Sequence, residues 1–201
     1  MKIGVSYWLS SAAIAAVLAA FISTSLAYVF SERAKRKKLI SEALASVASS
    51  GRMYRNYYMR MVEYDIDFRD QQNSMAIALK QKNVKAFEVH KEAGKFAQQV
   101  ASRHQDNILI VTTKLMQSAF LLAAYINKDV RKYKLQDEVN AVIEFNLCER
   151  SHFDKAMEEI DNGLLPHIGR MEQICNRLLW KQNQNLVVST VRSIYGVFKK
   201  K

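Results

Sequence analysis

The stretch IGVSYWLSSAAIAAVLAAFISTSLAYVFS, residues 3–31, decides the fold and the setting of this chain. It holds no charged side chain, and the basic sequence ERAKRKK follows it directly at residues 32–38. A helix rises about 1.5 Å per residue, so this run is long enough to cross a hydrocarbon core of about 30 Å with some tilt. We therefore expect residues 1–31 to be a transmembrane anchor.

The flanking charges predict the orientation of the anchor. Only Lys2 and the amino terminus precede it, whereas five cations follow it within six positions. Basic flanks stay in the cytoplasm, so we expect the N-terminus outside and the rest of the chain inside the inner (plasma) membrane. A cleaved signal peptide, with Ser25-Leu26-Ala27 as its processing site, is the alternative. The long apolar run and the block of positive charge behind it favour the anchor.

Small residues follow two rows along the predicted anchor, and such rows let helix backbones approach closely. This predicted association face consists of Ser11, Ala12, Ala15, Ala16, Ala19, Ala20, Ser23 and Ala27. The alternative is an Ala-rich spanning helix without a partner. The cations behind the anchor are the predicted contact with anionic lipid headgroups: Arg33, Lys35, Arg36, Lys37 and Lys38.

The remaining sequence is typical of an all-α protein. Pro occurs once, Gly is rare and alternating strand patterns are almost absent. Breakers divide the chain into a basic juxtamembrane helix or hinge at 32–51, interrupted at Ser49-Ser50-Gly51, and a cytoplasmic bundle at 52–201. We expect about four long helices in the bundle, at 52–82, 84–127, 135–162 and 166–198. Short joins favour antiparallel neighbours.

Apolar residues at three- and four-residue spacing predict which helix faces form the core. They lie at Ile108, Val111, Leu115, Ala119, Leu122 and Ile126, at Ala141, Phe145, Cys148, His152, Ala156 and Ile160, and at Ile168, Met171, Cys175 and Leu178, followed by Leu186, Val191, Ile194 and Phe198. The stretch from Ile108 to Ile126 is apolar enough to suggest a second span. Lys114 and Gln117 near its centre favour a core helix instead.

Two further segments leave alternatives open. Residues 52–64 mix arginine, tyrosine and methionine, which suits bundle core or an amphipathic helix on the membrane surface; we favour core. The formal charge of 135–165 is −6 and its neighbours are basic, which predicts pairing between helices. Cys148 and Cys175 flank the marked turn at Asn162-Gly163 at similar distances, so an antiparallel hairpin would bring them close.

Motifs for chemistry are scarce. The sequence has no Gly-rich phosphate loop, no nucleophile elbow and no Cys-x-x-Cys pair. Glu149-x-x-His152 is half of a di-iron bundle motif, and the second half is missing. We expect no catalytic residue, no metal, no cofactor and no nucleic-acid partner.

The leading hypothesis is a non-enzymatic scaffold or assembly component that oligomerises, contacts the bilayer and binds a protein partner at the cytoplasmic face. The first alternative is a membrane effector whose small-residue face multimerises and perturbs the bilayer. A helical-bundle enzyme with a metal site is more distant.

Overall fold

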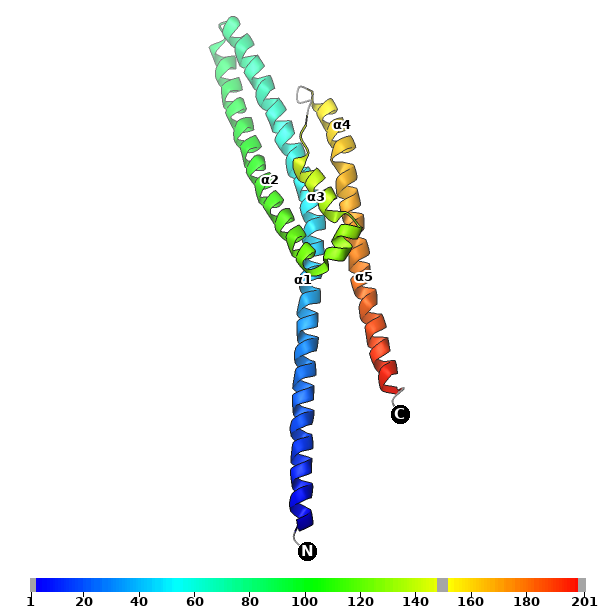
Figure 1. Ribbon diagram of the computed structural model, residues 1–201. Coiled ribbons are helices and arrows are strands. Elements are labelled where there is room, and N and C mark those ends of the chain that lie inside the picture. Colours follow the sequence, from blue (N-terminus) through cyan, green and yellow to red (C-terminus); the bar gives the residue numbers. More distant parts are fainter. Residues whose placement is uncertain (1–2, 148–151, 199–201) are drawn as a thin grey trace. The chain divides into compact units, whose positions relative to one another are not determined.

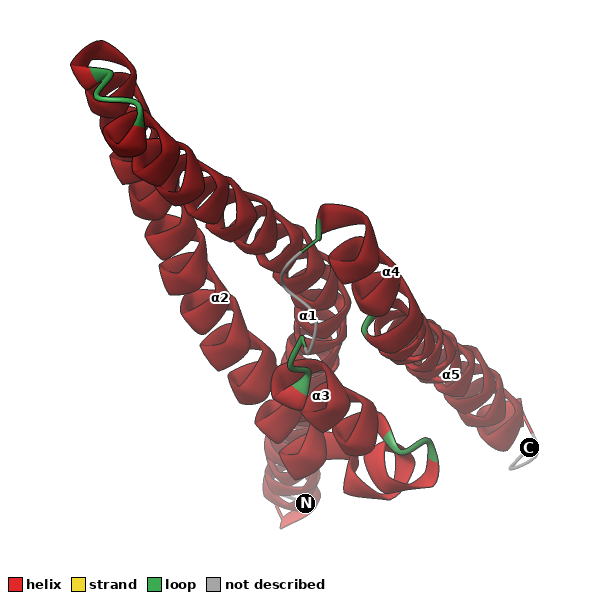
Figure 2. Ribbon diagram, turned by 90° about the horizontal axis from the view of Figure 1, so that it is seen from above, coloured by secondary structure: helices red, strands yellow, loops and turns green. Residues whose placement is uncertain are grey.

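The computed structural model describes the backbone of residues 3–147 and 152–198, and side chains within 16–147 and 152–184. The described parts contain helices and no strand, which confirms the all-α prediction (Figures 1 and 2). The helices are α1 (Ile3–Lys80), α2 (Val84–Lys132), α3 (Leu135–Glu144), α4 (Phe153–Gly163) and α5 (Leu165–Phe198). The chain forms two compact units, Met1–Ile40 and Ser41–Lys201, and α1 contributes to both.

The predicted interruption at Ser49-Ser50-Gly51 is wrong, because α1 continues through it. Ser50 and Gly51 are buried inside the second unit. A Cβ atom on Gly51 would collide with the side chain of Met171 on α5. The small residues therefore serve close packing between two helices, and the tertiary contact outweighs their low helix propensity. The buried core begins before Arg52, since Leu44 and Val47 are fully buried.

The predicted helix at 135–162 is divided into α3 and α4. The backbone of Phe145 leaves helical geometry, with φ −57° and ψ 124°. The N–H of Leu147, itself buried, donates a hydrogen bond of 3.1 Å to the hydroxyl of Tyr58. His152, predicted on an apolar stripe, is exposed at the N-cap of α4, so that prediction is wrong. Contacts with α1 thus hold an extended segment that periodicity alone does not reveal.

The marked turn at Asn162-Gly163 does not reverse the chain. Leu164 keeps a right-handed helical backbone, and its N–H donates to the carbonyl of Ile160 at 2.9 Å. Figure 1 shows α5 continuing in line with α4. Pro166 lies in the first turn of α5, where its missing N–H is tolerated. The antiparallel hairpin that would bring Cys148 and Cys175 together is therefore wrong; Cys148 lies outside the described residues, and Cys175 is buried.

Contacts within the second unit show the direction of neighbouring helices. Tyr64 of α1 contacts Phe96 of α2 with ring centroids 6.5 Å apart, and Ser118 of α2 donates to Ser46 of α1 at 2.8 Å. Residue numbers fall on α2 as they rise on α1, so these two helices are antiparallel. The predicted core faces of α2, α4 and α5 are confirmed for the residues that are buried, which are Val111, Leu115, Ala119, Leu122, Ala156, Ile160, Ile168, Met171, Cys175 and Leu178. The other predicted members are half-buried at Ile108, Ile126, Ala141 and Phe145, and the side chains beyond residue 184 lie outside the described residues.

Candidate membrane-anchoring and interaction surfaces

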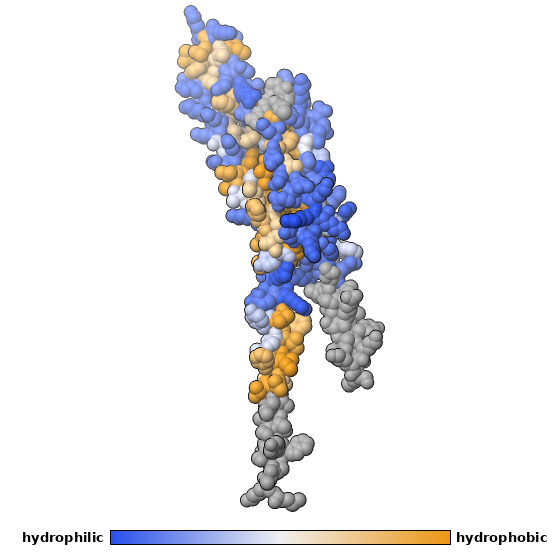
Figure 3. All heavy atoms as spheres, viewed as in Figure 1, coloured by the Kyte–Doolittle hydropathy of each residue, from blue (hydrophilic) through white to orange (hydrophobic). Residues whose placement is uncertain are grey.

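The first surface is the apolar segment of α1. Every side chain from 16 to 31 is exposed, including Val17 at 68% and Phe21 at 72%. Figure 3 shows this segment as a nearly continuous apolar stretch. No other element of the same unit covers it, because the unit ends at Ile40 and contains α1 only. Exposed apolar surface of this extent marks a membrane or protein contact.

The small-residue rows lie within this surface. Ala16, Ala19, Ala20, Ser23 and Ala27 are exposed, whereas the side chains of the other predicted members, Ser11, Ala12 and Ala15, lie outside the described residues. The hydroxyl of Ser23 donates to the carbonyl of Ala20 at 2.9 Å, and Thr24 donates to the same oxygen. Both hydroxyls are thus satisfied within their own helix. An association face here would depend on close packing of small side chains.

The basic segment follows without a break in the helix. Arg33, Lys35, Arg36 and Lys38 are exposed, and Lys37 is half-buried. The Nζ atom of Lys35 lies 3.0 Å from a carboxylate oxygen of Glu32. The carboxylate of Glu32 thus offsets part of the positive charge of this segment. The contact of these cations with anionic lipid headgroups stays a prediction.

A second apolar surface lies on α2. By length and composition, α2 is apolar enough to cross a membrane, and 22% of its most apolar window is buried. Leu115 and its neighbours in the stripe face the core, as predicted. On another face of the helix, Leu109 is 66% exposed and Phe120 is 64% exposed, with Met116 between them in sequence. We name Leu109, Met116 and Phe120 the outer stripe of α2.

Ion pairs join α1 to the helices that follow α3. Arg52 contacts both carboxylate oxygens of Glu172, at 2.6 and 3.2 Å, and Arg55 contacts Asp161 at 2.8 Å. Tyr54 lies buried among these pairs, and burial raises its pKa to about 12. Residues 52–64 are therefore bundle core, and the alternative of a helix on the membrane surface is wrong.

Glu138 of α3 is the centre of the most connected polar cluster. Its carboxylate contacts Nδ1 of His167 at 2.7 Å and Nε of Arg170 at 2.8 Å. Burial alone would raise the pKa of Glu138, but the hydrogen bonds from Arg170 and His167 outweigh burial and lower it. The predicted pairing of the acidic 135–165 segment with basic neighbours is confirmed here and at Asp161.

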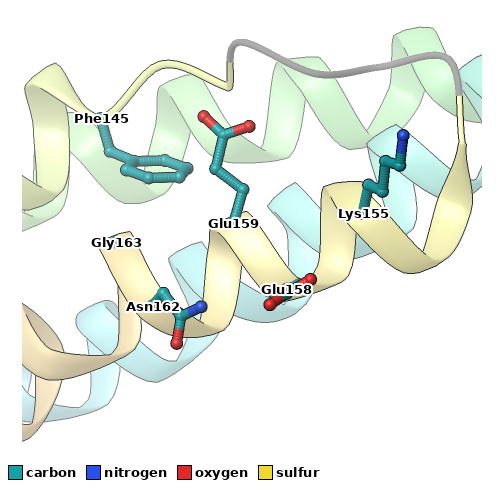
Figure 4. Close-up of a pocket in the computed structure, with 6 residues that line it drawn as sticks. All are labelled: Phe145, Lys155, Glu158, Glu159, Asn162 and Gly163. Carbon is teal, nitrogen blue, oxygen red and sulfur yellow. The ribbon is translucent and has the colours of Figure 1, made fainter.

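A hollow of about 490 Å³ lies beside α4 (Figure 4). Its lining combines one aromatic ring, one lysine and two carboxylates, contributed by Phe145, Lys155, Glu158, Glu159, Asn162 and Gly163. A Cβ on Gly163 would lie 2.6 Å from the ring of Phe145, so this wall requires glycine. Glu149 of the half-motif lies outside the described residues. Among those that are described, no group of three His, Cys, Asp or Glu side chains is placed to hold a metal ion.

Comparison with known protein families, with curated proteins and with solved structures found no match for this chain. The sequence alone indicates the exposed apolar segment and the basic segment of α1. Sequence reasoning missed the outer stripe of α2, although the apolar residues of 108–126 occupy two faces of a helix, and that signal was present.

Proposed function

We propose that this protein is a membrane-anchored scaffold or assembly component. In this proposal residues 1–31 cross the inner (plasma) membrane once, with the N-terminus outside. The helices that follow form an antiparallel bundle in the cytoplasm, which oligomerises and binds a protein partner. One observation carries the proposal: α1 continues from an exposed apolar segment, through a basic segment, into the core of a separate unit.

Each part of α1 fits one step of this arrangement. The exposed apolar side chains from 16 to 31 suit lipid, where a helix satisfies all of its backbone hydrogen bonds internally. The cations at 33–38 suit the cytoplasmic headgroup region. From Ile40 onward buried residues recur at helical spacing, which suits a bundle in water.

The outer stripe of α2 supports a protein partner. Leu109, Met116 and Phe120 follow seven- and four-residue spacing, so they lie along one face of the helix. Helices that associate in water bury a stripe of this kind. The core of α2 is supplied by other side chains, among them Leu115 and Leu122, so the stripe has no internal structural role within the described chain.

The topology is tested with a reporter that is active only in the cytoplasm. Fused behind Lys201, the reporter should be active in cells, and charge reversal at Arg33, Arg36 and Lys37 should weaken the orientation preference. Activity of an exported reporter at the same position would contradict the proposed topology.

Assembly is tested by the oligomer size of the full chain in mild detergent. Replacing Ala15 and Ala19 by Leu should separate the helix backbones and lower association, whereas Leu at Val17 and Phe21 is the matched control on another face. Partner binding by the outer stripe is tested separately by Leu109→Ser with Phe120→Ser. If neither pair changes the mass of the complex or the proteins that purify with it, the scaffold proposal fails.

A further inference from the structure

The turn between α1 and α2 forms a compact hairpin tip, which we define as residues 77–89. The N–H of Asn83 donates to the carbonyl of Ala78 at 2.9 Å, and the N–H of Lys82 donates to the carbonyl of Leu79 at 3.0 Å. The Asn83 side chain then caps α2 by accepting from the N–H of Ala86 at 3.1 Å. These bonds satisfy several of the free backbone groups at the two helix ends, and the turn forms a platform for its side chains.

Large aliphatic side chains project from this platform. Leu79 is 61% exposed and Val84 is 73% exposed, and Ile77 and Val89 are also exposed. Figure 3 shows apolar side chains gathered at the end of the hairpin among hydrophilic ones. The cavity beneath Leu79 and Val84 measures about 70 Å³, enough for one or two water molecules. Leu79 and Val84 line this small cavity and still keep most of their side-chain surface exposed.

The charges nearest to Leu79 and Val84 are positive. Lys80, Lys82 and Lys85 are exposed, and residues 71–87 contain no acidic side chain. The next acid, Glu88, pairs with Lys91 at 3.0 Å. Within the described parts of the chain, none of the three lysines has an ion-pair partner. The tip thus combines aliphatic side chains with uncompensated positive charge.

Lys82 holds its position at a conformational cost. Its φ of 56° lies in the left-handed region, where helix C-terminal turns favour glycine. A glycine would form the same hydrogen bonds with less strain. The lysine side chain therefore contributes nothing to the turn itself, and it can be removed without harming the hairpin.

We propose that the hairpin tip binds the surface of an anionic phospholipid bilayer. Leu79 and Val84 enter the boundary between headgroups and acyl chains, and the three lysines remain at the phosphates. The positive charge of the lysines favours an anionic surface. The exposed aliphatic side chains favour lipid over nucleic acid, because proteins that bind nucleic acid present aromatic and arginine side chains. This contact is independent of the N-terminal anchor and adds a second membrane-binding element to the protein.

The test uses the full chain held in nanodiscs of phosphatidylcholine, so that the anchor and the basic segment already face neutral lipid. Flotation then measures capture of the discs by separate vesicles of phosphatidylcholine, with or without phosphatidylserine. We expect capture by the phosphatidylserine vesicles alone. Lys80→Gln, Lys82→Gly and Lys85→Gln together should reduce the partition coefficient by about fivefold for each lysine, or roughly a hundredfold.

Two further variants distinguish binding by the hairpin tip from nonspecific attraction by the positive charge of the chain. Leu79→Ser with Val84→Ser should lower capture by at least about tenfold while the lysines remain. Replacing three exposed lysines elsewhere, Lys114, Lys128 and Lys155, by Gln removes the same charge and should leave capture nearly unchanged. The proposal is overturned if wild type shows no preference for phosphatidylserine, if the control triple loses as much as the tip triple, or if the serine pair has no effect. In that last case an acidic protein would be the better partner.

Discussion

Replacing Tyr58 by Phe removes the hydrogen bond between the α3–α4 connector and α1. The Tyr58 hydroxyl accepts from the N–H of Leu147 at 3.1 Å, and both residues are buried. Phenylalanine keeps the ring contact with Phe145, whose centroid lies 5.4 Å away, and the stacking on Tyr54 at 5.9 Å. It removes the acceptor and leaves a buried N–H without a partner. The expected loss is about 2 kcal/mol, within the range of about 1–3 kcal/mol for such a group.

Thermal unfolding followed by far-ultraviolet circular dichroism measures this loss. For a unit of the size of Ser41–Lys201, about 2 kcal/mol corresponds to a fall in Tm of about 4–8 °C. Tyr57→Phe is the matched control, because Tyr57 is one position away, is half-buried and contacts His104 through its ring. We expect its stability to change by less than about 0.5 kcal/mol. Equal stability of wild type and the Tyr58 variant would refute the tertiary origin of the break between α3 and α4.

Three further outcomes follow from the second unit. Glu138→Gln should lower the free energy of unfolding at neutral pH and make it less sensitive to acid. The fold lowers the pKa of Glu138, so the stabilisation by its carboxylate is present above the unfolded pKa near 4.5 and is lost as the pH falls through the folded pKa. Chemical denaturation over a pH series measures this. Cys175 should resist alkylation at mildly alkaline pH until denaturant is added, since burial raises the pKa of its thiol to about 12; labelling of the native chain at the rate of a free thiol would contradict this. A fragment starting at Ser41 should be more stable than one starting at Arg52. The shorter fragment lacks two fully buried apolar side chains, Leu44 and Val47, whose burial contributes about 1.5–3 kcal/mol each. Equal unfolding midpoints of the two fragments would show that these residues do not add to stability.

Helical periodicity predicted the core faces of α2 and α5 because residues such as Leu115 and Met171 repeat over several turns. The sequence-based prediction failed where one tertiary contact determines whether the helix continues or ends. Gly51 suggests a break when only its neighbours in sequence are considered, yet it permits the close approach of Met171. Gly163 suggests a turn, yet it accommodates the ring of Phe145 while the helix axis continues. At both positions the glycine makes room for a side chain from another part of the sequence. Helix propensity depends on the residue type alone and does not include such contacts.

The distribution of charge connects the two proposed lipid contacts. Inside the second unit one acid of α3 and one of α4 pair with cations of α5 and α1, in the pairs Arg170–Glu138 and Arg55–Asp161. The formal net charge of the chain is +11. Two clusters stand next to exposed aliphatic or aromatic side chains: the cations at 33–38 beside the apolar segment of α1, and the lysines at 80–85 beside Leu79 and Val84. Cations beside exposed apolar side chains suit the surface of an anionic bilayer, where charged headgroups lie next to acyl chains. Since the clusters lie on different units, neutralising one should leave the lipid contact of the other intact.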